Sequence, residues 1–180
     1  MLRFAGNTQT GYFLYTVPLR STSAERYPFL ADEATLEQFV REWNAGALSR
    51  SAWTHAAHVA VAAYYAFDHD ADRLFARMKT GIRNLNECLG VVNSEDSGYH
   101  ETLTRFWSIT LKVFAESQAS PSRFELVTEA VIAFGENRDL HRAYYSFDVV
   151  ANRHARREWV EPDLQPIADD RFLAGGKGID

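Results

Sequence analysis

Residues 52–67 read Ala52-Trp53-Thr54-His55-Ala56-Ala57-His58-Val59-Ala60-Val61-Ala62-Ala63-Tyr64-Tyr65-Ala66-Phe67. The stretch is apolar almost all round, and a helix of this kind is expected to be buried. His55 and His58 stand three residues apart, which places both imidazoles on one face of the helix. An unpaired buried polar group costs about 1–3 kcal/mol. We therefore expect each imidazole to have a partner, and one metal ion could serve both.

Helical periodicity continues on both sides of this stretch. Leu36, Phe39, Val40 and Trp43 follow the spacing i, i+3, i+4, i+7, which predicts an amphipathic helix ending near Gly46. Its start, Thr35-Leu36-Glu37-Gln38, resembles a capping box. A third helix is predicted from a cap near Asp70 to Gly90. A fourth is predicted from about Tyr99, and a fifth after the Ser120-Pro121 start signal. Two shorter helical segments are predicted at 140–145 and 149–159.

The predicted fold class is all-α, a single-domain helical bundle of four to five main helices with an irregular N-terminal arm. We expect residues 1–31 to form either a mobile extension or an arm packed on the domain, with a short strand at Tyr12–Val17. The bundle is expected over 32–167 and a flexible tail over 168–180. The length of 180 residues suits one domain.

Composition narrows the classes of partner. The net charge is −5 and no block of Lys or Arg stands out, which disfavours nucleic acid and anionic membranes as main partners. No stretch is convincing as a membrane span, and the N-terminus is a weak match to a signal peptide, so we expect a cytoplasmic protein. The single cysteine, Cys88, excludes an intrachain disulfide and is predicted to be a core thiol.

A third histidine extends the predicted site. His100 shares the apolar face of the fourth predicted helix with Leu103, Thr104 and Trp107. His55, His58 and His100 are therefore the predicted ligands of a divalent transition metal, with Zn or Fe the best matches to imidazole. Glu101 is the predicted catalytic residue, as a further ligand, an orienting group or a general base, with pairing to Arg105 as the alternative. The predicted pocket-lining residues are Thr54, Tyr65, Tyr99 and Thr104.

Three hypotheses for the function follow. The first is a mononuclear metal-dependent enzyme acting on a small molecule, hydrolytic or lytic with Zn and oxygen-using with Fe or Cu. The second is a non-catalytic binding or regulatory module whose histidines are structural. The third is a subunit that works with a partner protein or as a homo-oligomer. Nucleotide-binding and common hydrolase motifs are absent from the sequence.

Four short blocks carry a resemblance to a known family. They are Trp53-Thr54-His55-Ala56-Ala57-His58, then Gly81-Ile82-Arg83-Asn84-Leu85-Asn86, then residues 98–106 (GYHETLTRF), then Trp159-Val160-Glu161-Pro162-Asp163-Leu164. Together they resemble a bacterial family of small helical proteins that has no assigned activity. The resemblance covers about residues 32–167 and places His55, His58, His100 and Glu101 in matching positions. It implies one helical domain and carries over no catalytic role.

Overall fold

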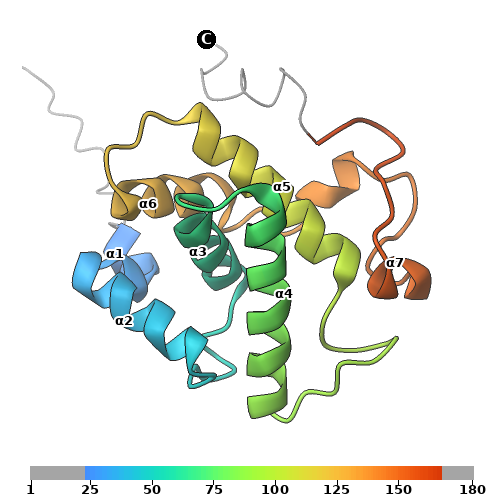
Figure 1. The fold of residues 1–180 in the computed structure, drawn as a ribbon, viewed down its shortest axis with the longest axis horizontal. Coiled ribbons are helices and arrows are strands. Elements are labelled where there is room, and N and C mark those ends of the chain that lie inside the picture. Colours follow the sequence, from blue (N-terminus) through green and yellow to red (C-terminus); the bar gives the residue numbers. More distant parts are fainter. Residues whose placement is uncertain (1–22, 168–180) are drawn as a thin grey trace, which may run out of the picture.

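The computed structural model describes residues 23–167, which are all-α and contain no strand. Five helices of 12 or more residues form the bundle, which confirms the predicted fold class (Figure 1). The elements in chain order are α1 Ser23–Arg26, the 3-10 helix η1 Pro28–Leu30, α2 Glu33–Asn44, α3 His55–Ala66, α4 Ala71–Cys88, α5 Glu101–Ser117, α6 Arg123–Phe134, the 3-10 helix η2 Leu140–Ala143, and α7 Arg153–Arg157.

Helix α3 lies in the middle of the bundle, as its apolar sequence predicts. Figure 1 shows it surrounded by α2, α4 and α6, and it also packs against α5. Six of its eight buried residues are alanine. Such short side chains let neighbouring helices approach closely. Helix α3 is therefore the central helix on which the other helices pack.

Two of the main helices, α2 and α6, have N-cap residues that differ from the predicted ones. Helix α2 is capped by Asp32, whose side chain accepts from Thr35 N–H at 2.8 Å, so Thr35 lies inside the helix. Helix α6 is capped by Ser122, so Pro121 precedes the helix instead of opening it. Each region contains several good capping residues close together, and the sequence alone does not rank them. The predicted cap of α4 at Asp70 is confirmed.

The segment after α6 contains less helix than predicted. Residues 140–145 form only the short η2, and 149–159 contain only the five residues of α7. These residues still build a second core cluster against α5, in which Tyr144, Tyr145 and Val149 surround Phe106. Aromatic packing, rather than helix formation, therefore attaches the C-terminal segment to the bundle.

Three further expectations concern the edges of the domain. Cys88 is exposed, not in the core, because it is the last residue of α4 and the buried stripe runs through Leu85. Tyr27 and Leu30, placed in the predicted arm, pack into the main core. The predicted strand at Tyr12–Val17 and the tail at 168–180 lie outside the described residues. Within 23–167, no helix has the length and apolar character needed to cross a membrane.

Candidate functional site

A cavity of about 320 Å³ lies between α3, α4 and the start of α5, and we call it the central cavity. Its walls are mainly apolar, and six of the residues that form them are Val59, Ala62, Met78, Ile82, Leu103 and Leu111. Polar side chains interrupt this apolar surface. They include His55, His58, Tyr99, His100, Thr104 and Arg138. The structure thus brings the three predicted histidines to one cavity.

His55, at the first position of α3, is held by the end of α6. Its Nε2 lies 3.1 Å from the carbonyl oxygen of Phe134. Because a carbonyl can only accept, Nε2 carries the proton and Nδ1 keeps a free lone pair. Burial lowers the pKa of His55, and the positive charge of Arg138 lowers it further. A neutral imidazole with one unused acceptor therefore lines the cavity.

His58 is fixed by its own helix. Its Nδ1 lies 2.8 Å from the carbonyl oxygen of Thr54, so Nδ1 carries the proton and Nε2 is the free acceptor. The imidazole also packs on Trp53, with 3.8 Å between ring centroids. Burial, together with the neighbouring His55, lowers the pKa of His58 to about 4. His58 is consequently a second neutral acceptor on the same face of α3.

His100 occupies a different structural position from the one predicted. It is the N-cap of α5, with extended backbone angles, and not a residue on the buried helical face. Its Nδ1 accepts from Leu103 N–H at 3.3 Å, and its Nε2 lies 3.0 Å from the carbonyl oxygen of Val149. Burial lowers the pKa of His100 to about 4. Both ring nitrogens are engaged, so His100 holds the start of α5 against the C-terminal segment.

Tyr99 carries a buried hydroxyl that has no hydrogen-bond partner within the described residues. The side chain is only 5% exposed and lines the central cavity. Its position is fixed by the backbone, because Tyr99 N–H donates to Asn93 Oδ1 at 3.0 Å, and Asn86 donates to the same oxygen at 2.8 Å. Burial raises the pKa of the Tyr99 phenol, and the nearby Glu101 carboxylate raises it further, so the phenol stays protonated. Tyr99 thus places one unused donor in the wall of the cavity that His55 and His58, with their two unused acceptors, also line.

The other predicted site residues are distributed over several places. Thr104 lines the central cavity, whereas Thr54 caps α3 by accepting from Ala57 N–H. Tyr65 donates to Asn44 and lies outside the cavity. Glu101 lies in a neighbouring polar pocket, where its carboxylate contacts Lys79 Nζ at 2.8 Å. Its partner is thus Lys79 from α4; the alternative partner, Arg105, pairs with Asp72 instead.

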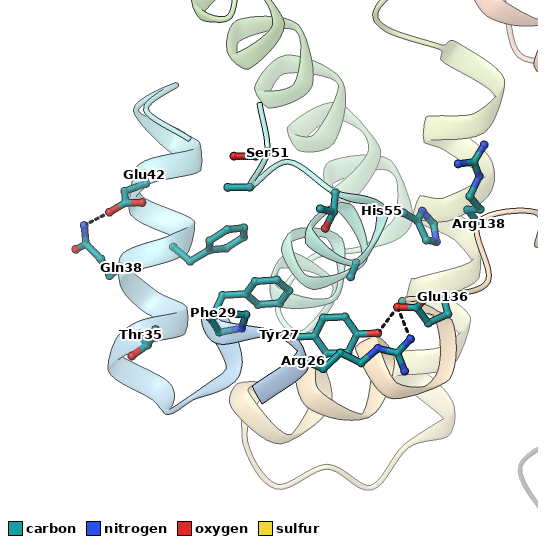
Figure 2. Close-up of a pocket in the computed structure, with 16 residues that line it drawn as sticks. Arg26, Tyr27, Phe29, Thr35, Gln38, Glu42, Ser51, His55, Glu136 and Arg138 are labelled. Carbon is teal, nitrogen blue, oxygen red and sulfur yellow. Dashed lines mark hydrogen bonds and ion pairs between the residues drawn. The ribbon is translucent and has the colours of Figure 1, made fainter. Parts of the chain in front are cut away.

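A wide groove of about 790 Å³ adjoins the central cavity, and Tyr27, Phe29 and Phe39 form its aromatic floor. Figure 2 shows His55 and Arg138 together at one end of this groove, with Gln38 and Glu42 of α2 on the opposite side. His55 and Arg138 line both hollows. The groove is therefore placed as an approach to the central cavity.

Arg138 joins the candidate site although no sequence pattern marks it. It lies in the short turn after α6, carries an exposed guanidinium and lines both hollows. The backbone there is held by His141, which is buried and whose Nδ1 lies 3.2 Å from the carbonyl oxygen of Arg138. A turn residue has no periodicity to mark it, so only the proximity of α6 to α3 reveals this role.

Within residues 23–167, no group of three or more His, Cys, Asp and Glu side chains is arranged to hold a metal ion. Two residues of the predicted metal site are engaged elsewhere. Both ring nitrogens of His100 make hydrogen bonds, and the Glu101 carboxylate pairs with Lys79. His55 and His58 each retain one free nitrogen. The predicted metal ligation, and the choice between Zn and Fe, stay predictions.

Comparisons with models of protein families, with curated proteins and with solved structures gave no match. The resemblance of the WTHAAH and YHETLT blocks to a bacterial helical family therefore stays a prediction.

Proposed function

We propose that the protein binds a small, mainly apolar molecule in the central cavity, and that this molecule carries both a hydrogen-bond acceptor and a donor. The observation that carries the proposal is the buried, unpartnered hydroxyl of Tyr99. A buried polar group without a partner costs about 1–3 kcal/mol. A ligand acceptor placed against this hydroxyl would remove that cost, and the phenol is protonated and ready to donate.

The two histidines of α3 supply the complementary half of the recognition. His55 Nδ1 and His58 Nε2 are lone-pair acceptors with no hydrogen-bond partner among residues 23–167. The volume of about 320 Å³ falls within the usual range for small-molecule sites, which are mostly apolar with a small number of placed polar groups. A ligand with an apolar body, one acceptor and one donor therefore matches the cavity in size and chemistry.

The experiment is a methyl NMR titration with primary aryl amides, namely benzamide, 1-naphthamide and 3-phenylpropanamide. Each carries an acceptor oxygen and a donor nitrogen on an apolar body. We expect at least one to shift the Met78 and Leu111 methyl signals saturably, and isopropylbenzene, a shape match for benzamide without polar atoms, to bind more weakly.

Two variants make the test specific. Tyr99→Phe removes the unpartnered hydroxyl and should weaken amide binding about tenfold, the usual value of one good hydrogen bond to a ligand. Tyr145→Phe is the matched control, because that buried tyrosine donates to Val160 O at 2.9 Å and does not line the cavity. The proposal fails if no amide shifts the two methyl groups, or if Tyr99→Phe binds the amides as tightly as the wild type.

The metal-dependent enzyme stays the second candidate, and the two free imidazole nitrogens favour it. In that case His55 Nδ1 and His58 Nε2 would be the protein ligands of Zn or Fe, and the ion would supply an activated water or oxygen chemistry. His100 would keep its capping role. Elemental analysis distinguishes this candidate from metal-free binding, as described in the Discussion.

A further inference from the structure

A second hollow, of about 290 Å³, lies beside the central cavity, and Tyr99 lines both. We call it the basic pocket. Its charged lining consists of Lys79, Arg83, Arg156 and Arg157 on the positive side and Glu95 and Glu101 on the negative side. The pocket therefore has a positive balance inside a chain whose net charge is −5.

Both carboxylates of the basic pocket are already neutralised. Glu101 Oε1 lies 2.8 Å from Lys79 Nζ, and Glu95 Oε1 lies 2.6 Å from Arg157 Nη1. Across the described part of the chain, neither Arg83 nor Arg156 has an ion-pair partner. Two guanidinium groups thus line one polar pocket without a counter-charge.

Other contacts hold these two guanidinium groups in place. Arg156 donates to the carbonyl oxygens of Gly98 at 3.3 Å, Tyr99 at 3.4 Å and Val150 at 3.3 Å. Arg83 packs on the Tyr99 ring, with its guanidinium carbon 5.1 Å from the ring centroid. A guanidinium has five N–H donors, so both residues keep donors for a ligand. Such pre-positioning lowers the entropy cost of binding an anion.

Two uncharged polar side chains, Asn93 and Ser94, also line the pocket. Asn93 is already engaged, because its Oδ1 accepts from Asn86 and from Tyr99 N–H and its Nδ2 donates to the carbonyl oxygen of Arg83, whereas Ser94 keeps a donor. The Ser94 hydroxyl oxygen accepts from Asp96 N–H at 3.3 Å, which leaves its own hydrogen free. Donors therefore exceed acceptors in the basic pocket, and the missing component is an anion with several acceptor oxygens. A planar carboxylate matches one guanidinium, whereas the tetrahedral oxygens of a phosphate can meet two guanidinium groups from different directions.

We propose that the basic pocket binds a phosphate group, either the free ion or a small phosphate monoester, through Arg83 and Arg156 with Ser94 as a further donor. The inference does not depend on the proposed function, because a different hollow and different donors carry it. The volume of about 290 Å³ exceeds the space of a single phosphate ion, which leaves room for an organic group on the ester.

The test is an NMR titration of arginine Nε–Hε signals with inorganic phosphate, at constant ionic strength maintained by chloride. We expect saturable shifts of the Arg83 and Arg156 signals and none with chloride alone. Arg83→Gln should weaken binding about tenfold or more, since it removes a charge-assisted contact. Arg138→Gln is the matched control, because it removes another exposed guanidinium that lines the other hollows, and it should bind phosphate like the wild type.

Arg156 also donates to three backbone carbonyl oxygens, so Arg156→Gln changes the local structure as well as the charge. Its effect on phosphate binding is therefore compared with that of Arg83→Gln. The proposal is overturned if the shifts rise linearly without saturating in the millimolar range, if chloride reproduces them, or if Arg83→Gln and Arg138→Gln weaken binding equally. Phenyl phosphate then separates the two sources of the group. Binding about tenfold tighter than inorganic phosphate assigns a monoester, and equal binding assigns the free ion.

Discussion

Removal of the Tyr99 hydroxyl should stabilise the protein, which is unusual for a change in a buried side chain. The hydroxyl has no partner and the side chain is 5% exposed, so the folded state bears a desolvation cost that the unfolded chain does not. That cost is about 1–3 kcal/mol for a buried hydroxyl. The Tyr99 side chain borders a cavity large enough for water. We therefore expect Tyr99→Phe to raise the free energy of unfolding by about 1 kcal/mol, at the lower end of that range.

The assay is urea denaturation followed by far-ultraviolet circular dichroism, with thermal unfolding as a second readout. A gain of 1 kcal/mol corresponds to roughly 2–4 °C in Tm for a chain of this size. The matched control is Tyr145→Phe, which leaves the carbonyl oxygen of Val160 without its donor and should lower stability by about 1 kcal/mol. The two substitutions delete the same atom from buried tyrosines and have opposite expected signs. A loss of stability in Tyr99→Phe comparable with that in Tyr145→Phe would refute the reasoning.

Three further predictions concern packing, pH and metal. A Cβ at Gly81 would overlap the six-membered ring of the fully buried Trp43, so Gly81→Ala should cost about 2 kcal/mol in urea denaturation despite the better helix propensity of alanine; unchanged stability would contradict this packing. His58 and His100 have pKa values lowered to about 4, so the unfolded state binds more protons than the folded state between pH 6.5 and 4. Stability should therefore fall as the pH is lowered through that range, by up to about 3 kcal/mol for the buried His100 and by less for the partly exposed His58. His100→Asn, which keeps a capping side chain, should reduce the pH dependence, and an unchanged slope would argue against the neutral buried imidazole. Elemental analysis after reconstitution with Zn or Fe should, on the metal hypothesis, give one equivalent that is lost in His55→Ala and kept in His100→Asn, whereas substoichiometric metal in the wild type would refute that hypothesis.

Periodicity made the fold predictable, because burying one face of a helix leaves a signal that repeats every 3.6 residues. That signal identified the five main helices and the central position of α3. It was weaker at helix ends, where Asp32 competes with Thr35 and Ser122 with Ser120, since each of these residues can cap a helix. Segments held by aromatic packing, such as the one around Tyr145, were predicted as longer helices than the structure contains.

For the candidate site, the sequence indicated which residues lie together better than it indicated what each one does. Tyr99 and the three histidines line one cavity. The role of His100 depends on where α5 begins, and a shift of one residue changes it. A residue just before a helix caps the helix, whereas a residue inside the helix projects from one of its faces. The Lys79 partner of Glu101 and the placement of Arg138 depend on how separate helices and turns meet, which no local pattern records.

The alanine content of α3 also bears on how this sequence can change over evolutionary time. An alanine packed on all sides has only glycine as a smaller replacement, and glycine weakens a helix interior by about 1 kcal/mol. Any larger residue must displace a neighbouring helix. Apart from Ala56, which lines the groove, and Ala62, which lines the central cavity, the buried alanines of α3 are therefore positions with almost no tolerated substitutions. We expect divergence between descendants of this chain to collect on the outer faces of the surrounding helices instead.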